Sequence, residues 1–250
     1  MNKAKEKAIE DRKDISRFVV HLTRDDRKDF DDGRTALENF EGIIENRKVL
    51  ALKPHCIHAN KIPDKLRASY SVCCLSEIPL TELHLLTKYI PGRKIRLSDY
   101  GIVFSREFII SKGAQPAIYI NSYGENNLLR EAADTIYNIA EKGNFRQGKL
   151  RRILPYLNAM HERYDFTWER EWRIKGDLVF TPKDIVCVIL PEQENKWRKK
   201  FTLRGIPIIS PGWSYEKIIA EFSNQARSAR RYWVSKKIRP RRKKGNEIKK

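Results

Sequence analysis

Polar side chains that could do chemistry lie on three segments that are otherwise rich in apolar residues. The first is the run 18–23, which ends in His21 and Thr23. Alternation along a strand puts both on the same side, where an imidazole and a hydroxyl could hydrogen-bond a ribose or a carboxamide. A histidine satisfied within the core explains the pair equally well.

The second segment, 100–106, begins with Tyr100 and Gly101 and ends with Arg106. An aromatic residue next to a glycine at the start of a strand permits the close approach of a flat ring. A simple turn that leads into a buried strand is an equally good explanation.

The third segment, 168–174, alternates like a half-exposed strand. In that conformation Glu169, Glu171 and Arg173 share one face, and two tryptophans share the other. Two neighbouring carboxylates raise each other's pKa or share a proton, unless Arg173 neutralises one of them. A carboxylate flanked by tryptophans is a candidate catalytic group, and the alternative is a ladder of surface ion pairs.

Several common classes of enzyme are excluded by the motifs that the chain lacks. The sequence has no G-x-G-x-x-G, no P-loop, no H-E-x-x-H, no paired C-x-x-C and no G-x-S-x-G. His55, Cys56 and His58 fall in a basic loop and are expected to be incidental, so no metal is predicted. The five aspartates within 25–32 are expected to form a solvated loop, although a nuclease is a third alternative for the function.

The elements that must position these residues follow irregularly along the chain. Strands are predicted at 16–23, 69–75, 100–105, 117–121, 168–174, 185–190 and 207–210. Helices are predicted from 34 to about 44, 79–89, 106–112, 127–141, 149–164 and 215–222, and the segment 53–68 is predicted to be a loop. This irregular order predicts an α+β fold with a mixed or mainly antiparallel sheet.

The chain of 250 residues carries a net charge of +19, and the charge is unevenly distributed. Residues 226–250 hold 12 Lys and Arg against Glu247 alone, a net of +11, which leaves +8 for residues 1–225. We therefore divide the chain into a polar arm (1–16), a single domain (17–225) and a basic tail (226–250). The tail is expected to bind nucleic acid, RNA rather than DNA, unless it only aids solubility. The predicted contacts are Arg227, Arg230, Arg231, Tyr232 and Trp233.

Other features predict a cytoplasmic protein that does not enter a membrane. No apolar run approaches the roughly 18 residues that a membrane span needs, and residues 1–14 lack the apolar region of a signal peptide. Four cysteines in 250 residues are too few for a disulfide scaffold, so all four are expected to be reduced.

The runs FVVHLT, VCCLSEIPL, YGIVFSREFIISKGAQPAIYI and EREWRI, in this order, resemble the AbiG abortive-infection proteins of bacteria, in particular the AbiGi component. The resemblance covers about residues 17–190. The order of these motifs is also similar to the ADP-ribosyltransferase fold of DarT-type toxins, which modify nucleic acid. This second resemblance implies a split, curved sheet that binds NAD without a Rossmann motif.

Carried over to this chain, the transferase resemblance implies a site for NAD as substrate. His21 and Thr23 would hold the nicotinamide ribose and carboxamide, and Tyr100 would pack on the nicotinamide. Arg106 would hold the pyrophosphate, and Ser76 is a further candidate, although its neighbours do not form the usual S-T-S triplet. Glu171 would be the catalytic acid and Glu169 would complete an E-x-E arrangement.

Two functions of different classes therefore remain. The favoured expectation is an NAD-dependent ADP-ribosyltransferase that modifies nucleic acid as a defence toxin, because a carboxylate near the ribose would stabilise the oxocarbenium charge of the reaction. The alternative is a non-catalytic antitoxin, or a nucleic-acid-binding component, of an abortive-infection pair. Either function implies a cognate toxin or antitoxin as a partner protein.

Overall fold

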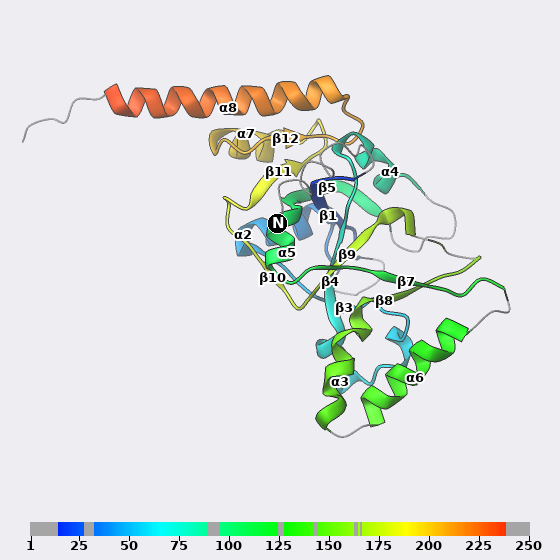
Figure 1. Cartoon of the computed structure of the whole chain (residues 1–250). Coiled ribbons are helices and arrows are strands. Elements are labelled where there is room, and N and C mark those ends of the chain that lie inside the picture. Colours follow the sequence, from blue (N-terminus) through cyan, green and yellow to red (C-terminus); the bar gives the residue numbers. More distant parts are fainter. Residues whose placement is uncertain are drawn as a thin grey trace, which may run out of the picture.

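The computed structural model describes residues 15–27, 33–89, 96–124, 128–142, 145–162, 165 and 167–238, and side chains are not described at 142, 145–148, 203 and 227–238. The polar arm therefore lies outside the described residues except for its last two positions. An α+β fold is confirmed, with one large sheet at its centre (Figure 1).

The large sheet has eight described strands and is mainly antiparallel. Seven follow one path in the order β12-β11-β5-β1-β4-β9-β6, and β3 pairs with β4 off this path. Only β11 and β12 pair in parallel among them. The strands of the path are β1 (Phe18–Arg24), β4 (Ser71–Ser76), β5 (Leu97–Ser105), β6 (Gln115–Pro116), β9 (Glu171–Lys175), β11 (Ile185–Ile189) and β12 (Ile208–Ile209), and β3 is Lys53–Pro54.

Helices cover both faces of this sheet. Helix α2 (Ala36–Asn46) begins in a capping box, in which Thr35 and Glu38 satisfy each other's backbone N–H groups. It packs on one face with α5 (Arg106–Ser111) and α7 (Asn195–Leu203), a helix that the sequence analysis missed. The other face is covered by α4 (Leu83–Thr87) and the start of α8 (Tyr215–Ile238).

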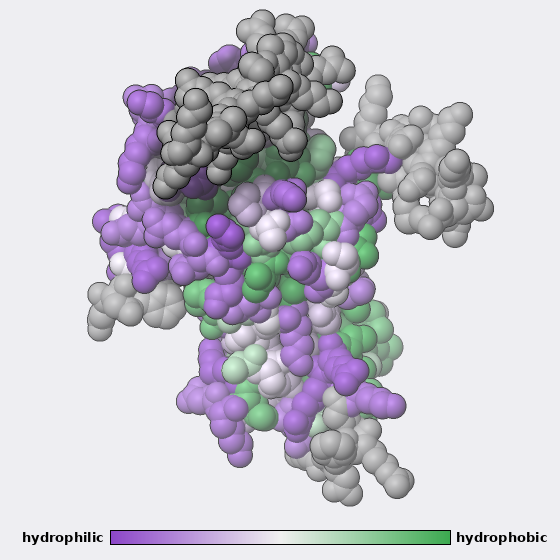
Figure 2. All heavy atoms as spheres, turned by 90° about the vertical axis from the view of Figure 1, so that its left-hand side faces the viewer, coloured by the Kyte–Doolittle hydropathy of each residue, from purple (hydrophilic) through white to green (hydrophobic). Residues whose placement is uncertain are grey.

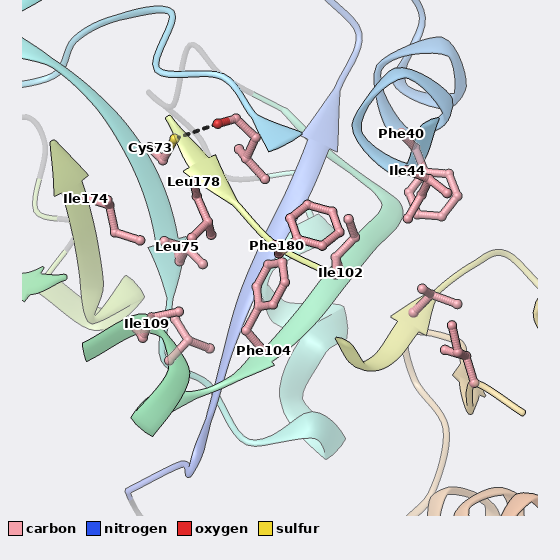
Figure 3. Close-up of a cluster of buried hydrophobic side chains, with 14 of the residues drawn as sticks. Phe40, Ile44, Cys73, Leu75, Ile102, Phe104, Ile109, Ile174, Leu178 and Phe180 are labelled. Carbon is pink, nitrogen blue, oxygen red and sulfur yellow. Dashed lines mark hydrogen bonds between the residues drawn. The ribbon is translucent and has the colours of Figure 1, made fainter. Parts of the chain in front are cut away.

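The largest of the three described hydrophobic cores lies between α2, α5, α7 and the sheet. Figure 3 shows Phe40 and Ile44 from α2 opposite Ile102 and Phe104 from β5, with Phe180 between the strands. The rings of Phe104 and Phe180 meet edge to face at 5.2 Å. The Cys73 thiol also points into this core and donates to the Val49 carbonyl.

A smaller lobe with its own core lies below the sheet in Figure 1. It contains α3 (Asp64–Tyr70), α6 (Leu128–Lys142) and the parallel pair β7 (Ile118–Asn121) and β8 (Leu157–Met160). Short 3-10 turns complete the fold at Ala59–Lys61, Leu80–Glu82, Phe145–Arg152, Leu154–Tyr156 and Thr167–Glu169, and β2 (Lys48–Val49) pairs with β10 (Leu178–Val179).

Several predicted segments differ from the structure. The predicted loop 53–68 contains β3 and the start of α3, which begins after Pro63. The predicted helix 149–164 is instead 3-10 turns followed by β8, because Pro155 interrupts the helical backbone. The predicted helix 215–222 continues to Ile238, so α8 crosses the predicted boundary at 226 and projects beyond the body of the molecule (Figure 1).

The described surface is largely polar, in keeping with the charge. On the face shown in Figure 2, hydrophilic side chains surround a smaller group of hydrophobic ones near the middle. All four cysteines are free thiols. Within the described part of the chain, no helix combines the length and the apolar character needed to cross a membrane.

Candidate functional site

A pocket of about 540 Å³ opens beside the central strands β1 and β4 and is closed by α2 and the segment 48–55. The two strands pair at Val20 and Ser76, and the pocket is lined by residues of both. Five of the predicted site residues line it: His21, Thr23, Ser76, Glu169 and Glu171. The structure therefore brings together residues that are up to 150 positions apart in the sequence.

The hydrogen bonds of His21 and Thr23 tie both side chains to the surrounding backbone. The His21 Nδ1–H group donates to the Cys74 carbonyl at 2.9 Å, and burial lowers the pKa of the imidazole, which therefore stays neutral near pH 7. The Thr23 hydroxyl donates to the Ala36 carbonyl at 2.8 Å. Thr23 thus joins β1 to α2, and His21 joins β1 to β4.

Glu171 forms a partly buried ion pair with Arg173, two residues along the same strand. The Arg173 guanidinium donates to Glu171 Oε2 at 2.7 Å, and their side chains are 1% and 11% exposed, respectively. Burial alone would raise the pKa of Glu171, but the charge and hydrogen bonds of Arg173 outweigh it and leave the pKa below its usual value. Glu171 is therefore ionised, and its negative charge is balanced by the positive charge of Arg173.

The Arg173 guanidinium also reaches into the smaller lobe. It donates to the carbonyl of Pro155 at 2.9 Å, so one side chain links β9 of the sheet to the turn before β8. Its own pKa is lowered by burial and raised by Glu171, and the second effect prevails. Since Arg173 is buried and Glu171 is only slightly exposed, the arrangement is that of a structural ion pair.

The segment 168–174 is not the single strand that its alternation predicts. Residues Thr167–Glu169 form a 3-10 turn, and Arg170 adopts a left-handed backbone (φ 46°) before β9 begins at Glu171. Glu169 and Glu171 consequently do not follow one another on the face of one strand. The Glu77 carboxylate holds this bend, because it accepts hydrogen bonds from Arg170 at 2.8 Å and from the Trp172 indole at 2.9 Å.

Two predicted site residues do not line the pocket. The Tyr100 ring packs against Phe40, with centroids 6.0 Å apart, and burial, followed by the nearby Glu194, raises its pKa. The Arg106 guanidinium lies 5.3 Å from the centre of the Trp172 ring. A flat ligand ring was expected to approach Gly101 closely, but the neighbouring strand β1 occupies that place. A Cβ at position 101 would lie 2.6 Å from the His21 carbonyl oxygen.

Several residues that line the pocket were not predicted from the sequence, among them His55 and Cys74. Burial lowers the pKa of His55 to about 4 and raises that of the Cys74 thiol, so both are uncharged near pH 7. His55 was expected to be incidental in a loop, and no local pattern indicates that this loop folds back beside Glu171. In the described residues, no group of three or more metal-binding side chains comes together.

One comparison identifies the family of the chain. Residues 55–204, which are more than half of its length, match the family model described as "Putative abortive phage resistance protein AbiGi, antitoxin". The chain belongs to the AbiGi family. No curated protein and no solved structure matches it.

Membership of the AbiGi family confirms the abortive-infection and toxin–antitoxin context and corrects the expected function. The favoured expectation, an NAD-dependent ADP-ribosyltransferase toxin, is wrong, because the family is described as an antitoxin. The alternative expectation of an antitoxin agrees with that description. The ion pair gives a physical reason for the error, since it explains a partly buried glutamate on this strand without any catalytic role. NAD as a ligand of the pocket stays a prediction.

The predicted nucleic-acid contacts of this AbiGi protein lie on the second half of α8, within 227–233. The backbone of that half is helical, whereas its side chains lie outside the described residues. Residues 239–250 of the predicted tail lie outside them as well.

Proposed function

We propose that this chain is the antitoxin of an abortive-infection pair and that it neutralises a partner toxin by binding it, without catalysis. The observation that carries the proposal is the match of residues 55–204 to a family described as an antitoxin. The internal hydrogen bonds of the pocket support it, because Thr23 and Glu171 use their polar groups within the fold.

We further propose that the antitoxin contacts nucleic acid, preferably RNA, through the basic second half of α8. The net charge of +19 supports this proposal, because Lys and Arg that neutralise phosphates release counterions. The four free thiols support a reducing site of action, and we propose the cytoplasm. We also propose that the sheet shares the fold of the ADP-ribosyltransferases but not their activity.

The antitoxin role is tested by growth assays in a bacterial host. Each protein encoded directly upstream or downstream of this chain is expressed from an inducible promoter, alone and together with the chain. We expect one neighbour to arrest growth when it is alone, and the chain to restore growth and to co-purify with that neighbour. Growth arrest by this chain alone, or a toxic neighbour that it does not neutralise, would overturn the proposal.

A further inference from the structure

Helix α6 carries more apolar surface than the protein covers. Its buried side is formed by Ala133, Tyr137 and Ala140, which pack into the core of the smaller lobe. Tyr137 stacks on the buried His58 ring at 4.6 Å and donates from its hydroxyl to the Lys61 carbonyl. These contacts, together with the partly buried Ile136 and the hydrogen bond between Asp134 and His58, hold the helix against the lobe.

A second apolar stripe runs along the neighbouring side of α6. It consists of Leu129, Ala132, Ile136 and Ile139, spaced three, four and three residues apart. Leu129 is 60% exposed and Ile139 is 40% exposed, Ala132 is exposed, and Ile136 is half-buried at the edge of the lobe core. Leu128, which is 73% exposed, extends the stripe at the start of the helix.

This stripe has the spacing of a helix-docking surface. Anchors at such intervals form a straight seam on a helix, onto which a second amphipathic helix can pack. The stripe runs from Leu129 to Ile139, which is about 15 Å along the helix. The fold buries the adjacent side of α6 and leaves most of the stripe exposed. Figure 1 shows α6 at the edge of the smaller lobe.

The charge of the protein indicates what kind of partner fits the stripe. Two copies of a chain with a net charge of +19 repel each other, which disfavours self-association. Residues 128–156, which include α6 and the turns after it, hold six Lys and Arg against three Asp and Glu. Lys149 and Arg152 among these are exposed just after the helix. An acidic partner gains attraction where a second copy meets repulsion.

We infer that the stripe on α6 docks an amphipathic helix of an acidic partner protein and that this partner is the cognate toxin. The inference rests on the proposed antitoxin function. The apolar side of the toxin helix covers Leu129, Ile136 and Ile139, and its acidic flanks face Lys149 and Arg152.

The test uses the full chain and the neighbouring protein identified as toxic in the growth assay. The variant Leu129→Glu/Ile139→Glu places two carboxylates on the stripe and opposite the acidic partner. The matched control Ile110→Glu/Val179→Glu carries the same charges at residues of similar exposure (50% and 56%) on other elements. Circular dichroism and thermal unfolding of both variants establish that each is folded.

We expect the α6 variant to bind the toxin at least about 30-fold more weakly in calorimetry, which is the loss of one or two interface anchors. The control should bind within about twofold of the parent. The affinity of the parent should also fall as salt is raised, and hydrogen exchange in α6 should slow in the complex.

Other results would overturn the inference and leave the antitoxin role intact. Equal binding of the toxin by both variants would place its docking site elsewhere. A dimer of the chain alone in sedimentation, dissolved by the α6 variant, would show that a second copy covers the stripe. If no neighbouring toxin is bound or neutralised by the parent chain, it is the proposed function that fails.

Discussion

The Glu171–Arg173 pair shows at the scale of single residues how one neighbour changes the role of a side chain. A carboxylate in a pocket beside a neutral histidine has the attributes of a catalytic group. The Arg173 guanidinium, two residues along the strand, forms an ion pair with this carboxylate. The same guanidinium donates to the Pro155 carbonyl and so links the pair to the smaller lobe. A glutamate and an arginine two residues apart on a strand are therefore compatible with an active site or with a structural ion pair. The packing around them decides which of the two they form.

Glu171→Gln is expected to lower the free energy of unfolding by about 3 kcal/mol, because it leaves the Arg173 guanidinium buried without a counter-charge. The double variant Glu171→Met/Arg173→Met should recover most of that loss, since two apolar side chains can replace a buried pair. Equilibrium unfolding in urea measures both. A Glu171→Gln protein as stable as the parent would contradict the structural role of the pair.

Acid should destabilise the protein through His55. Burial lowers its pKa from 6.5 to about 4, so the unfolded chain binds a proton below pH 6.5 that the folded chain does not accept until about pH 4. This contribution to stability is complete above pH 6.5 and is lost as the pH falls towards 4, up to about 3 kcal/mol. The lowered pKa of Glu171 acts in the same direction.

The variant His55→Gln should flatten this acid dependence in urea titrations between about pH 7 and about pH 4.5. His161→Gln serves as the control, because the His161 side chain is 34% exposed and lies outside the pocket lining. An unchanged slope in the His55 variant would assign the acid sensitivity to other groups.

At the scale of elements, periodicity predicted the secondary structure of short segments but not which side of a helix the rest of the protein buries. The strand around 100–105 and the helix from 34 were predictable, because alternation and helical spacing are strong there. The buried side of α6 was not predictable, because apolar residues occupy two adjacent stripes of that helix. The left-handed Arg170, which ends the alternation before Glu171, has no signal of its own.

The pocket required tertiary information that no local pattern contains. His21 and Glu171 were identifiable as polar residues on strands, and the structure brings them to one pocket. Tyr100 carried a similar signal, yet it packs against α2. His55 joins the pocket through a loop whose path is set by contacts with the lobe.

Glycine at position 101 is expected to be required for the pairing of β1 with β5. A Cβ at this position would lie 2.6 Å from the His21 carbonyl oxygen and 2.7 Å from a methyl group of Leu22. Gly101→Ala should therefore destabilise the fold by about 2 kcal/mol in urea unfolding.

Gly42→Ala is the matched control for that substitution. Gly42 lies inside α2, and its new methyl group would meet only the end of the Arg34 side chain, at 3.4 Å. Its stability should be unchanged or increased by about 0.5–1 kcal/mol, because alanine favours a helix more than glycine does. If the two variants have equal stability, the backbone contact at Gly101 does not limit the fold.

At the scale of the whole molecule, the charge predicts how RNA binding should respond to salt. Replacing Arg227, Arg230 and Arg231 by Gln removes three cations from α8. If each neutralises one phosphate, the slope of log affinity against log salt should become shallower by about 2 for single-stranded RNA. Fluorescence anisotropy with RNA and DNA oligonucleotides of one sequence measures this slope and the preference between them.

The same charge change elsewhere provides the control for the RNA prediction. Replacing Lys65, Arg67 and Lys112 by Gln removes three cations from α3 and from the end of α5. This control should leave the slope close to that of the parent. Equal slopes in both variants would indicate that RNA binding depends on the net charge of the protein and not on the arginines of α8.

The place of β1 at the centre of the sheet has a consequence for synthesis on the ribosome. This strand is the first of the described strands to be made, but it pairs with β4 and β5, and β5 in turn pairs with β11, which ends at Ile189. At about 5–20 residues per second, roughly ten to thirty seconds separate the emergence of β1 from that of β11. The central strand of a newly started chain is therefore not enclosed until Ile189 has been made. A cell that stops translation would lose the supply of finished molecules at once, while those already folded persist.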